Sequence, residues 1–168
     1  MSSASHAYTF AMAIRALREE DRGLLRRATL ANMNWIGPRF TFDDVDESEE
    51  LTHYFRTFPR GRDFGLVDNE GGTVRAVAWL VFLPMESPGY GFVDTDTPEL
   101  SITTFEGFRG TGIGSDLLAQ LIASAKARGL RALSLSVEDG NRARHLYQRV
   151  GFKVAGRNGG SDTMLLTL

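Results

Sequence analysis

Apolar and polar residues alternate along several stretches of the chain, which predicts strands with one buried face. In residues 8–16, for example, Phe10, Met12 and Ile14 fall on the same side. Other stretches repeat apolar residues at helical spacing. The predicted strands are residues 8–16, 64–67, 73–83, 99–105 and 132–137. Helices are expected from Arg18 to Gly37-Pro38, from the acidic residues 43–50 to Phe58, and from the glycine-rich residues 109–115 to Gly129. This mixture predicts one mixed α/β domain over residues 1–168.

One segment, Arg109-Gly110-Thr111-Gly112-Ile113-Gly114-Ser115, connects a predicted strand to a predicted helix. Its three glycines at every second position leave the backbone free to curl with its N–H groups pointing inward. The helix that follows adds the positive end of its dipole, which favours a bound anion. Arg109 supplies a permanent cation whose planar guanidinium group suits phosphate oxygens. We therefore predict a phosphate or pyrophosphate site here.

Several classes of phosphate-containing ligand use such a segment. A P-loop requires Lys followed by Ser or Thr, and this segment contains no Lys. A dinucleotide site requires G-x-G-x-x-G and an acid about 20 residues later, a pattern that Gly110, Gly112, Ser115 and Glu138 approach. The strand before the segment argues against this second class. Residues 100–105 are polar in their middle, whereas a buried parallel strand is almost continuously apolar.

A third pattern, R-x-x-G-x-G before a helix, matches Arg109, Gly112 and Gly114. A second motif follows later in the chain, because residues 143–152 read A-x-x-L-Y-x-x-x-G-F. Asn141 precedes this motif and lies one residue nearer the alanine than in the commonest family pattern. With both motifs in order, the chain from about residue 65 to its end resembles the GNAT superfamily of N-acetyltransferases.

The resemblance implies a twisted mixed sheet of about six to seven strands, with helices on both faces and a central gap that holds acetyl-CoA. Residues 99–168 would form the half that binds coenzyme A and carries out catalysis. In the family, the backbone of the strand at 99–105 binds the pantetheine arm. The strand at 133–137 must then diverge from it, because paired strands stand only ~4.8 Å apart. The residues implied in cofactor binding are Ile102, Thr103, Thr104, Arg109, Gly110, Thr111, Gly112, Ile113, Gly114, Ser115, Asn141, Ala143 and Tyr147.

Two side chains are candidates for proton transfer. An amine acceptor is protonated near neutral pH and must lose a proton before it attacks, so we expect Glu99, at the start of its strand, to accept that proton directly or through water. Asp94, Asp96 or an ordered water are the alternative bases, and a solvated acid at the end of the strand is the alternative role for Glu99. The departing thiolate needs a proton, which the phenol of Tyr147 carries at pH 7. Packing against its neighbours is the alternative role for Tyr147.

Candidates for acceptor binding lie outside the two motifs. The long polar loop at residues 84–98 contains Tyr90, Asp94 and Asp96, and loops of this length often carry function. Gly, Pro and Asp are also typical turn residues, so a turn is the alternative for this loop. Trp35, near the end of the first predicted helix, is the fourth candidate. The acidic candidates favour a cationic acceptor.

Composition excludes several other classes of function. Lys and Arg number 19 against 21 Asp and Glu, so the net charge of −2 predicts no nucleic-acid binding. The chain has no cysteine, which excludes disulfides and thiolate chemistry. His6, His53 and His145 lack the spacing of metal ligands, and we expect them at the surface without a metal. Residues 1–7 resemble a frayed end rather than a signal peptide, and no apolar run is long enough to span a membrane.

Taken with these patterns, the resemblance implies a cytoplasmic N-acetyltransferase that transfers an acetyl group directly from acetyl-CoA to a primary amine, most simply a small molecule. A protein or peptide N-terminus is an alternative acceptor. A non-catalytic acyl-CoA binding or sensing module, and a nucleotide-dependent oxidoreductase, are alternatives of other classes. A homodimer is compatible with the family.

Overall fold

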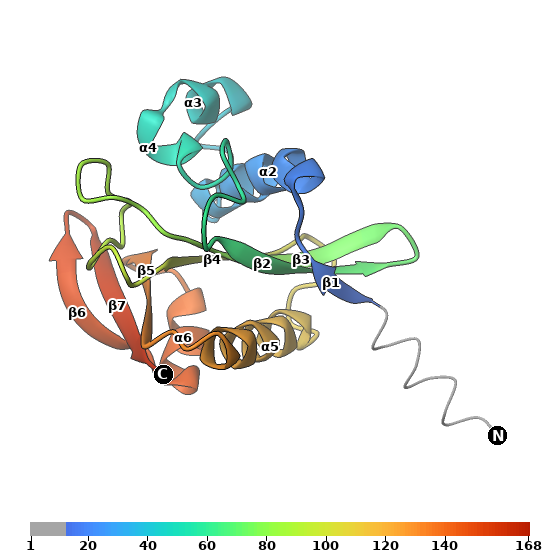
Figure 1. Cartoon of the computed structure of the whole chain (residues 1–168). Coiled ribbons are helices and arrows are strands. Elements are labelled where there is room, and N and C mark those ends of the chain that lie inside the picture. Colours follow the sequence, from blue (N-terminus) through green and yellow to red (C-terminus); the bar gives the residue numbers. More distant parts are fainter. Residues whose placement is uncertain (1–12) are drawn as a thin grey trace.

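A computed structural model describes residues 13–168 and places seven strands in one sheet, in the order β1-β2-β3-β4-β5-β7-β6 (Figure 1). The predicted first strand lies only partly within the described residues, where β1 covers Ile14–Ala16. The other strands are β2 Phe64–Glu70, β3 Thr73–Val81, β4 Glu99–Thr104, β5 Ala132–Glu138, β6 Lys153–Asn158 and β7 Ser161–Thr167. The mixed sheet that the sequence predicts is therefore confirmed.

The sheet consists of two antiparallel halves. Strands β1 to β4 form one half, and β5 to β7 form the other. The halves meet where β4 and β5 run parallel, and a single pair of residues, Glu99 and Ser134, is in register there. Beyond this pair the two strands diverge, as the sequence predicts. A largely antiparallel sheet also excludes the doubly wound dinucleotide fold, which requires parallel strands.

Helices cover both faces of the sheet, and each face has its own core (Figure 1). Helices α2 (Arg22–Met33), α3 (Phe42–Glu47) and α4 (Glu49–Thr52) lie on one face, together with the short 3-10 helix at Glu19–Asp21. Helices α5 (Ile113–Ala127) and α6 (Ala143–Val150) lie on the other face. Fully buried leucines of α5 pack against β3 and β5, and Trp79 of β3 is fully buried under the α2 face.

Two predicted elements end at different residues than expected. The helix predicted over residues 43–58 is divided, because Ser48 adopts an extended backbone with ψ of 112° between α3 and α4. The Ser48 hydroxyl accepts a hydrogen bond from the Leu51 amide and so begins α4. The strand predicted at 64–67 is longer, because β2 continues to Glu70, and only Gly71 and Gly72, both with positive φ, form the turn to β3.

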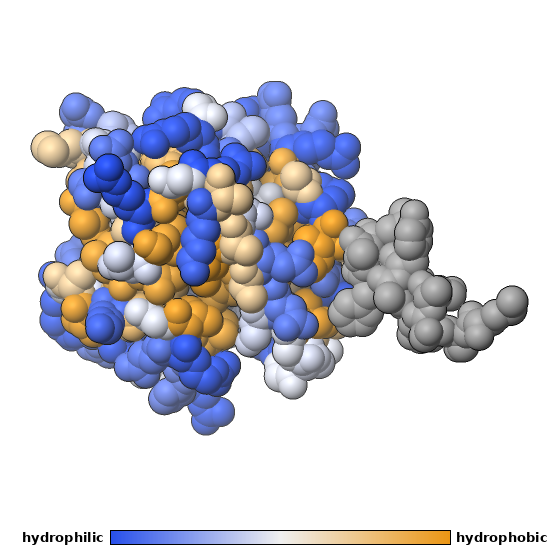
Figure 2. All heavy atoms as spheres, turned by 60° about the horizontal axis from the view of Figure 1, so that its bottom comes forward, coloured by the Kyte–Doolittle hydropathy of each residue, from blue (hydrophilic) through white to orange (hydrophobic). Residues whose placement is uncertain are grey.

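The surface of the described part of the chain mixes hydrophilic and apolar residues. Figure 2 shows the molecule turned toward the face of α5 and α6, where hydrophilic residues lie around the periphery and apolar residues show between them. The larger exposed apolar side chains are distributed over several elements, with Ile36 and Met85 the most exposed. Within residues 13–168 no helix has the length and apolar character needed to cross a membrane.

Candidate active site

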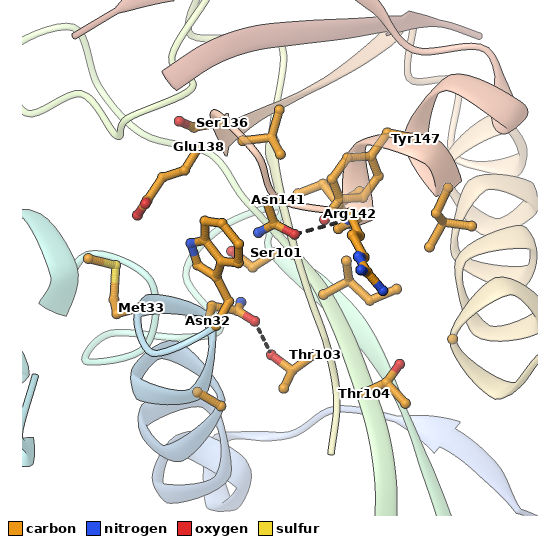
Figure 3. A pocket seen from close by; sticks show the side chains of 18 of the residues that line it. Asn32, Met33, Ser101, Thr103, Thr104, Ser136, Glu138, Asn141, Arg142 and Tyr147 are labelled. Carbon is orange, nitrogen blue, oxygen red and sulfur yellow. Dashed lines mark hydrogen bonds between the residues drawn. The ribbon is translucent and has the colours of Figure 1, made fainter. Parts of the chain in front are cut away.

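A cavity of about 1150 Å³ opens where β4 and β5 diverge. Its walls come from α2, α4, β4, the glycine-rich segment 109–115, the end of β5 and α6. Figure 3 shows side chains from opposite sides of the sheet pointing into this space: Asn32 and Met33 come from α2, and Arg142 and Tyr147 come from the region of α6. The cavity joins the two motifs that carry the family resemblance.

The glycine-rich segment forms the end of the cavity at the start of α5. Gly110 and Gly112 have φ of 74° and 84°, a backbone conformation that favours glycine and turns the chain into the helix. Gly114 lies against β4 so closely that a Cβ would stand 2.5 Å from the Thr104 hydroxyl oxygen. Arg109 is exposed at the cavity, and its Nε donates a hydrogen bond to the Thr104 carbonyl oxygen at 3.2 Å. Backbone N–H groups, a helix N-terminus and a cation thus converge here.

Not every residue of this segment lines the cavity. Gly110, Gly112, Gly114 and Ser115 do, together with Arg109. The Thr111 hydroxyl instead donates a hydrogen bond to the Phe108 carbonyl oxygen, and the half-buried Ile113 packs against the core beneath α5. The side chains of these two predicted cofactor-binding residues therefore support the shape of the segment and are not part of the cavity wall.

Strand β4 lines the cavity along its length, and its side chains alternate between the two faces. Ile102 packs with the core on the α5 face. Thr103 points to the opposite face, where its hydroxyl donates hydrogen bonds to the Asn32 side-chain oxygen at 2.8 Å and the Ala28 carbonyl at 3.3 Å. The hydroxyl of this predicted cofactor-binding residue thus holds α2 against the sheet (Figure 3). Beyond Glu99 the backbone of β4 has no strand partner on the β5 side among the described residues.

Glu99 is buried at the narrow end of the cavity, with 5% of its surface exposed. Its Oε1 accepts hydrogen bonds from the Tyr54 hydroxyl at 2.7 Å and from the Gly91 amide at 2.9 Å. Its Oε2 is buried and has no hydrogen-bond partner among the described residues. Burial raises the pKa of this carboxyl to about 7, although both hydrogen bonds act in the opposite direction. Glu99 therefore exchanges its proton near neutral pH.

Three consecutive loop residues surround this carboxyl. A Cβ on Gly89 would stand 2.1 Å from Glu99 Oε2, so only glycine fits against the carboxyl. The Tyr90 amide donates to the Tyr54 hydroxyl at 3.0 Å. A Cβ on Gly91 would stand 2.5 Å from the Leu135 carbonyl carbon. The loop thus packs against both β4 and β5 where they begin to diverge.

Tyr147 lies on α6 and lines the opposite side of the cavity (Figure 3). Its ring packs edge-on against Phe152, with centroids 5.9 Å apart. Burial alone raises the pKa of its phenol to about 12, so the hydroxyl stays protonated at neutral pH. The sequence leaves proton donation and packing as alternative roles for Tyr147, and the residue occupies a position compatible with both.

The start of α6 is organised by Asn141, whose side-chain oxygen accepts a hydrogen bond from the Ala143 amide at 3.0 Å. Asn141 and Ala143 both line the cavity, as expected. Two cations that the motifs do not include, Arg142 and Arg149, line it as well. They belong to the segment that carries the second motif, but neither is three or four residues from Tyr147, so helical spacing does not place them on its face.

The four candidates for acceptor binding divide into two pairs. Trp35 and Tyr90 line the cavity. Asp94 and Asp96 do not: they are exposed in the loop, where the Asp94 carboxylate accepts hydrogen bonds from the Asp96 and Thr97 amides at 2.9 and 2.8 Å. Asp96 pairs with Arg62 at 3.3 Å. The structure therefore does not bring these two aspartates to the cavity, and the Asp94 carboxylate forms part of a turn.

Sequence reasoning missed Tyr54, Met33 and Asn32 as cavity residues. Tyr54 follows α4 and is buried, and its ring stacks on that of Tyr90 with centroids 6.5 Å apart. The apolar spacing of residues 51–58 predicts burial for Tyr54, but nothing in the local sequence indicates a contact with Glu99, 45 residues away.

Segments far apart in the chain also meet at the rim of the cavity. Arg39 pairs with Glu138 at 3.1 Å, linking the loop after α2 to the end of β5. Close by, Trp35 lies against Gly140, where a Cβ would stand 3.8 Å from the indole ring. The Trp35 indole N–H is buried and has no hydrogen-bond partner among residues 13–168.

The histidines differ from one another in their surroundings. His145 is exposed, as expected, and His6 lies outside the described residues. His53 is half-buried instead of exposed, and its Nε2 and the Ser87 hydroxyl form a hydrogen bond of 2.8 Å. In the described part of the chain, no three His, Asp or Glu side chains are grouped as metal ligands.

Comparison with known sequences gives a consistent result. A model of the acetyltransferase (GNAT) family matches residues 29–152. The L-methionine sulfoximine/L-methionine sulfone acetyltransferase of Pseudomonas aeruginosa is 39% identical over 62 residues, which make up 36% of each chain. The ribosomal protein bS18-alanine N-acetyltransferase of Haemophilus influenzae is 42% identical over 45 residues, or 27% of this chain and 31% of that protein. The matched segments thus span only about a third of these relatives.

Solved structures align over most of the chain. An N-acetyltransferase from Staphylococcus aureus Mu50 is 27% identical, with a TM-score of 0.63 over 92% of this chain and 96% of that one. An N-acetyltransferase from Thermoplasma acidophilum, solved in complex with coenzyme A, has a TM-score of 0.67 over 94% of this chain and all of that one, at 18% identity. At that identity the second match concerns the fold alone.

Proposed function

The chain belongs to the GNAT family of acetyltransferases and is an acyltransferase enzyme, and from this premise we propose that it transfers an acetyl group from acetyl-CoA to a primary amine by direct attack. The observation that carries the proposal is the divergence of β4 and β5 after the pair Glu99 and Ser134. The resulting cavity leads from the glycine-rich segment at the start of α5 to the buried carboxyl of Glu99. This arrangement supports an anion site and a proton acceptor at two positions along one cavity.

The residues at the wide end suit the phosphates of coenzyme A. Arg109 and the amides of the glycine-rich segment would hold a pyrophosphate, with the dipole of α5 behind them. Arg142 and Arg149 add positive charge on the facing wall. The β4 backbone beyond Glu99 would hold the extended arm, since its groups on the β5 side lack a strand partner there. Acetyl-CoA supplies the acetyl thioester.

In the proposed reaction the amine nitrogen forms a bond to the acetyl carbon and the carbon–sulfur bond breaks. Glu99, in its ionised form, accepts the proton that the amine must lose, directly or through a water molecule. A carboxyl whose pKa is raised to about 7 is a stronger base than an ordinary glutamate and is still half ionised at neutral pH. The protonated phenol of Tyr147 supplies a proton to the departing thiolate.

The test is release of free thiol from acetyl-CoA in the presence of a panel of primary amines, measured with a thiol reagent. The chain contains no cysteine, so the reagent reports only coenzyme A. We expect release that depends on the amine and rises as the pH increases through about 7. In Glu99→Gln this rise should disappear and turnover should fall by ~10²-fold. An unchanged pH profile in the variant would remove Glu99 from the role of base.

Thiol release with none of the amines, together with calorimetric binding of coenzyme A, would instead support the non-catalytic binding module. A peptide N-terminus is the second candidate acceptor, because the matching relative from H. influenzae is named for the alanine of a ribosomal protein. Peptides beginning with alanine therefore belong in the panel, and release with these peptides alone would identify that class of acceptor.

A further inference from the structure

The cationic and apolar residues of the cavity lie on different walls. Among its lining residues the arginines are Arg109, Arg142 and Arg149, which all belong to the glycine-rich segment and to the region of α6. The opposite wall, which we call the acceptor wall, comes from α2, α4 and the loop before β4. The cavity-lining residues of these segments are Thr29, Ala31, Asn32, Met33, Trp35, Leu51, Tyr54 and Tyr90. Three of these eight side chains are aromatic, Thr29 and Asn32 are polar, and none is cationic.

Glu99 lies on the same face of β4 as the acceptor wall and is held there by Tyr54. Oε1 of this carboxyl already accepts two hydrogen bonds, and its Oε2 is buried without a partner among the described residues. An ammonium group that gives up a proton next to Glu99 would therefore have aromatic and apolar side chains around the rest of its molecule. The local charge favours a cation and disfavours a second anion.

Arg39 follows Trp35 of this wall by four residues, and it already has a partner. Its guanidinium group pairs with Glu138 at 3.1 Å at the rim. It also donates a hydrogen bond to the Met33 carbonyl oxygen at 2.7 Å. Arg39 does not line the cavity. A carboxylate bound at the acceptor wall would thus find no unpaired cation among the lining residues of this wall.

From this distribution we infer that the acceptor is a small amine with an apolar or aromatic body and no carboxylate, an inference that rests on the proposed acetyl transfer. A free amino acid carries its carboxylate one carbon from the amine, so placing the amine at Glu99 brings two carboxyl groups together in a desolvated site. A buried charge without a partner is strongly disfavoured. An arylalkylamine has the same ammonium group and a ring that can pack on the aromatic residues.

The rim limits the size of the acceptor as well. The Arg39–Glu138 pair connects the loop after α2 to the end of β5, and Trp35 lies near Gly140, where an added Cβ would stand 3.8 Å from the indole ring. We expect a compact amine to bind without displacing this connection. A polypeptide bound with its N-terminus at Glu99 would need a continuous open groove for the residues that follow.

The experiment compares matched acceptors that differ in one group. Phenethylamine, phenylalanine and phenylalaninamide share the ring and the primary amine, but only phenylalanine carries a carboxylate. We expect kcat/KM for phenethylamine to exceed that for phenylalanine by ~100-fold or more, as for loss of a charged group's partners. The kcat/KM for phenylalaninamide should approach that for phenethylamine, because phenylalaninamide is isosteric with phenylalanine and lacks the negative charge.

A variant tests the wall directly. Met33→Arg places a cation on the acceptor wall and should raise the kcat/KM of phenylalanine relative to phenethylamine by ~10-fold or more. Ile36→Arg is the matched control, because Ile36 is 63% exposed and lies outside the cavity lining. It adds the same charge three residues away and should leave the ratio unchanged.

The outcomes separate this inference from the proposed function. If phenylalanine is used as well as phenethylamine, or if phenylalaninamide is as poor as phenylalanine, the inference is overturned while acetyl transfer stands. If none of the three releases thiol but another amine of the panel does, the inference is overturned while acetyl transfer stands. If no amine of the panel releases thiol, the proposed function fails, and calorimetry with the protein saturated with coenzyme A decides the inference. Binding of phenethylamine in preference to phenylalanine supports it, and equal binding or no binding of phenethylamine overturns it.

Discussion

The buried carboxyl of Glu99 should make the stability of the protein depend on pH in a way that a single substitution removes. The pKa of this group is raised by burial from 4.5 to about 7 in the folded protein. Below 4.5 the carboxyl is protonated in both the folded and the unfolded chain, so its titration contributes no difference. Between 4.5 and about 7 only the unfolded chain releases the proton, and unfolding becomes more favourable as the pH rises.

The size of the effect follows from the two pKa values. Each tenfold change in a protonation equilibrium corresponds to about 1.4 kcal/mol, so the change from 4.5 to about 7 amounts to about 3 kcal/mol of unfolding free energy. In Glu99→Gln this position does not titrate. The free energy of unfolding of the variant minus that of the wild type should therefore increase by about 3 kcal/mol between pH 4 and pH 8.

Urea unfolding at a series of pH values, followed by tryptophan fluorescence, measures this difference. Tyr54→Phe provides a second variant, because it removes the hydroxyl that donates to Glu99 Oε1 at 2.7 Å. Without that donor the ionised carboxyl is less favourable, and the pKa of Glu99 in the folded protein rises further. The free energy of unfolding should therefore continue to fall up to a higher pH than in the wild type. Parallel curves for the wild type and Glu99→Gln would refute the reasoning, since they would mean that Glu99 titrates alike in both states.

Other substitutions test the remaining parts of the site. Arg109→Ala should raise the KM for acetyl-CoA by ~10-fold, measured by thiol release, with an unchanged melting temperature because Arg109 is exposed. Tyr147→Phe keeps the ring contact with Phe152 and removes the hydroxyl, so kcat should fall by ~10²-fold while the KM for acetyl-CoA stays the same. Full activity of this variant would leave only the packing role for Tyr147. Gly91→Ala forces a Cβ to within 2.5 Å of β5 and should lower the free energy of unfolding by ~1–3 kcal/mol in urea titrations. Gly160→Ala is the control: Gly160 has open space around it, so this substitution should leave the free energy of unfolding unchanged.

The parts of the site that could be predicted from the sequence are those fixed by short-range patterns. The glycine-rich segment and the start of α6 each need particular residues at fixed spacing, so Arg109, Gly112 and Asn141 are recognisable from the order of residues alone. The divergence of β4 and β5 followed from the space that an extended ligand needs between strands. These local rules hold wherever the segments are placed in the fold.

The environment of Glu99 could not be predicted, because it depends on contacts between distant segments. Tyr54, from a turn after α4, and Gly89 and Gly91, from the loop before β4, surround the carboxyl only after folding. For the same reason, the position of the aspartates of that loop could not be predicted from the sequence. Composition indicated both a turn and an acceptor site for Asp94, and only its hydrogen bonds to following amides decide for the turn.

Strands β4 and β5 lie in the middle of the sheet, yet beyond Glu99 and Ser134 each faces its neighbour without pairing. They are in effect two edge strands inside the protein. Exposed edges recruit other chains and are a common origin of aggregation, and proteins protect them by covering them. Here α2 lies over one face of the opening and α5 and α6 over the other. The unpaired backbone groups of these two strands are thus accessible to one narrow ligand and shielded from the strands of neighbouring proteins.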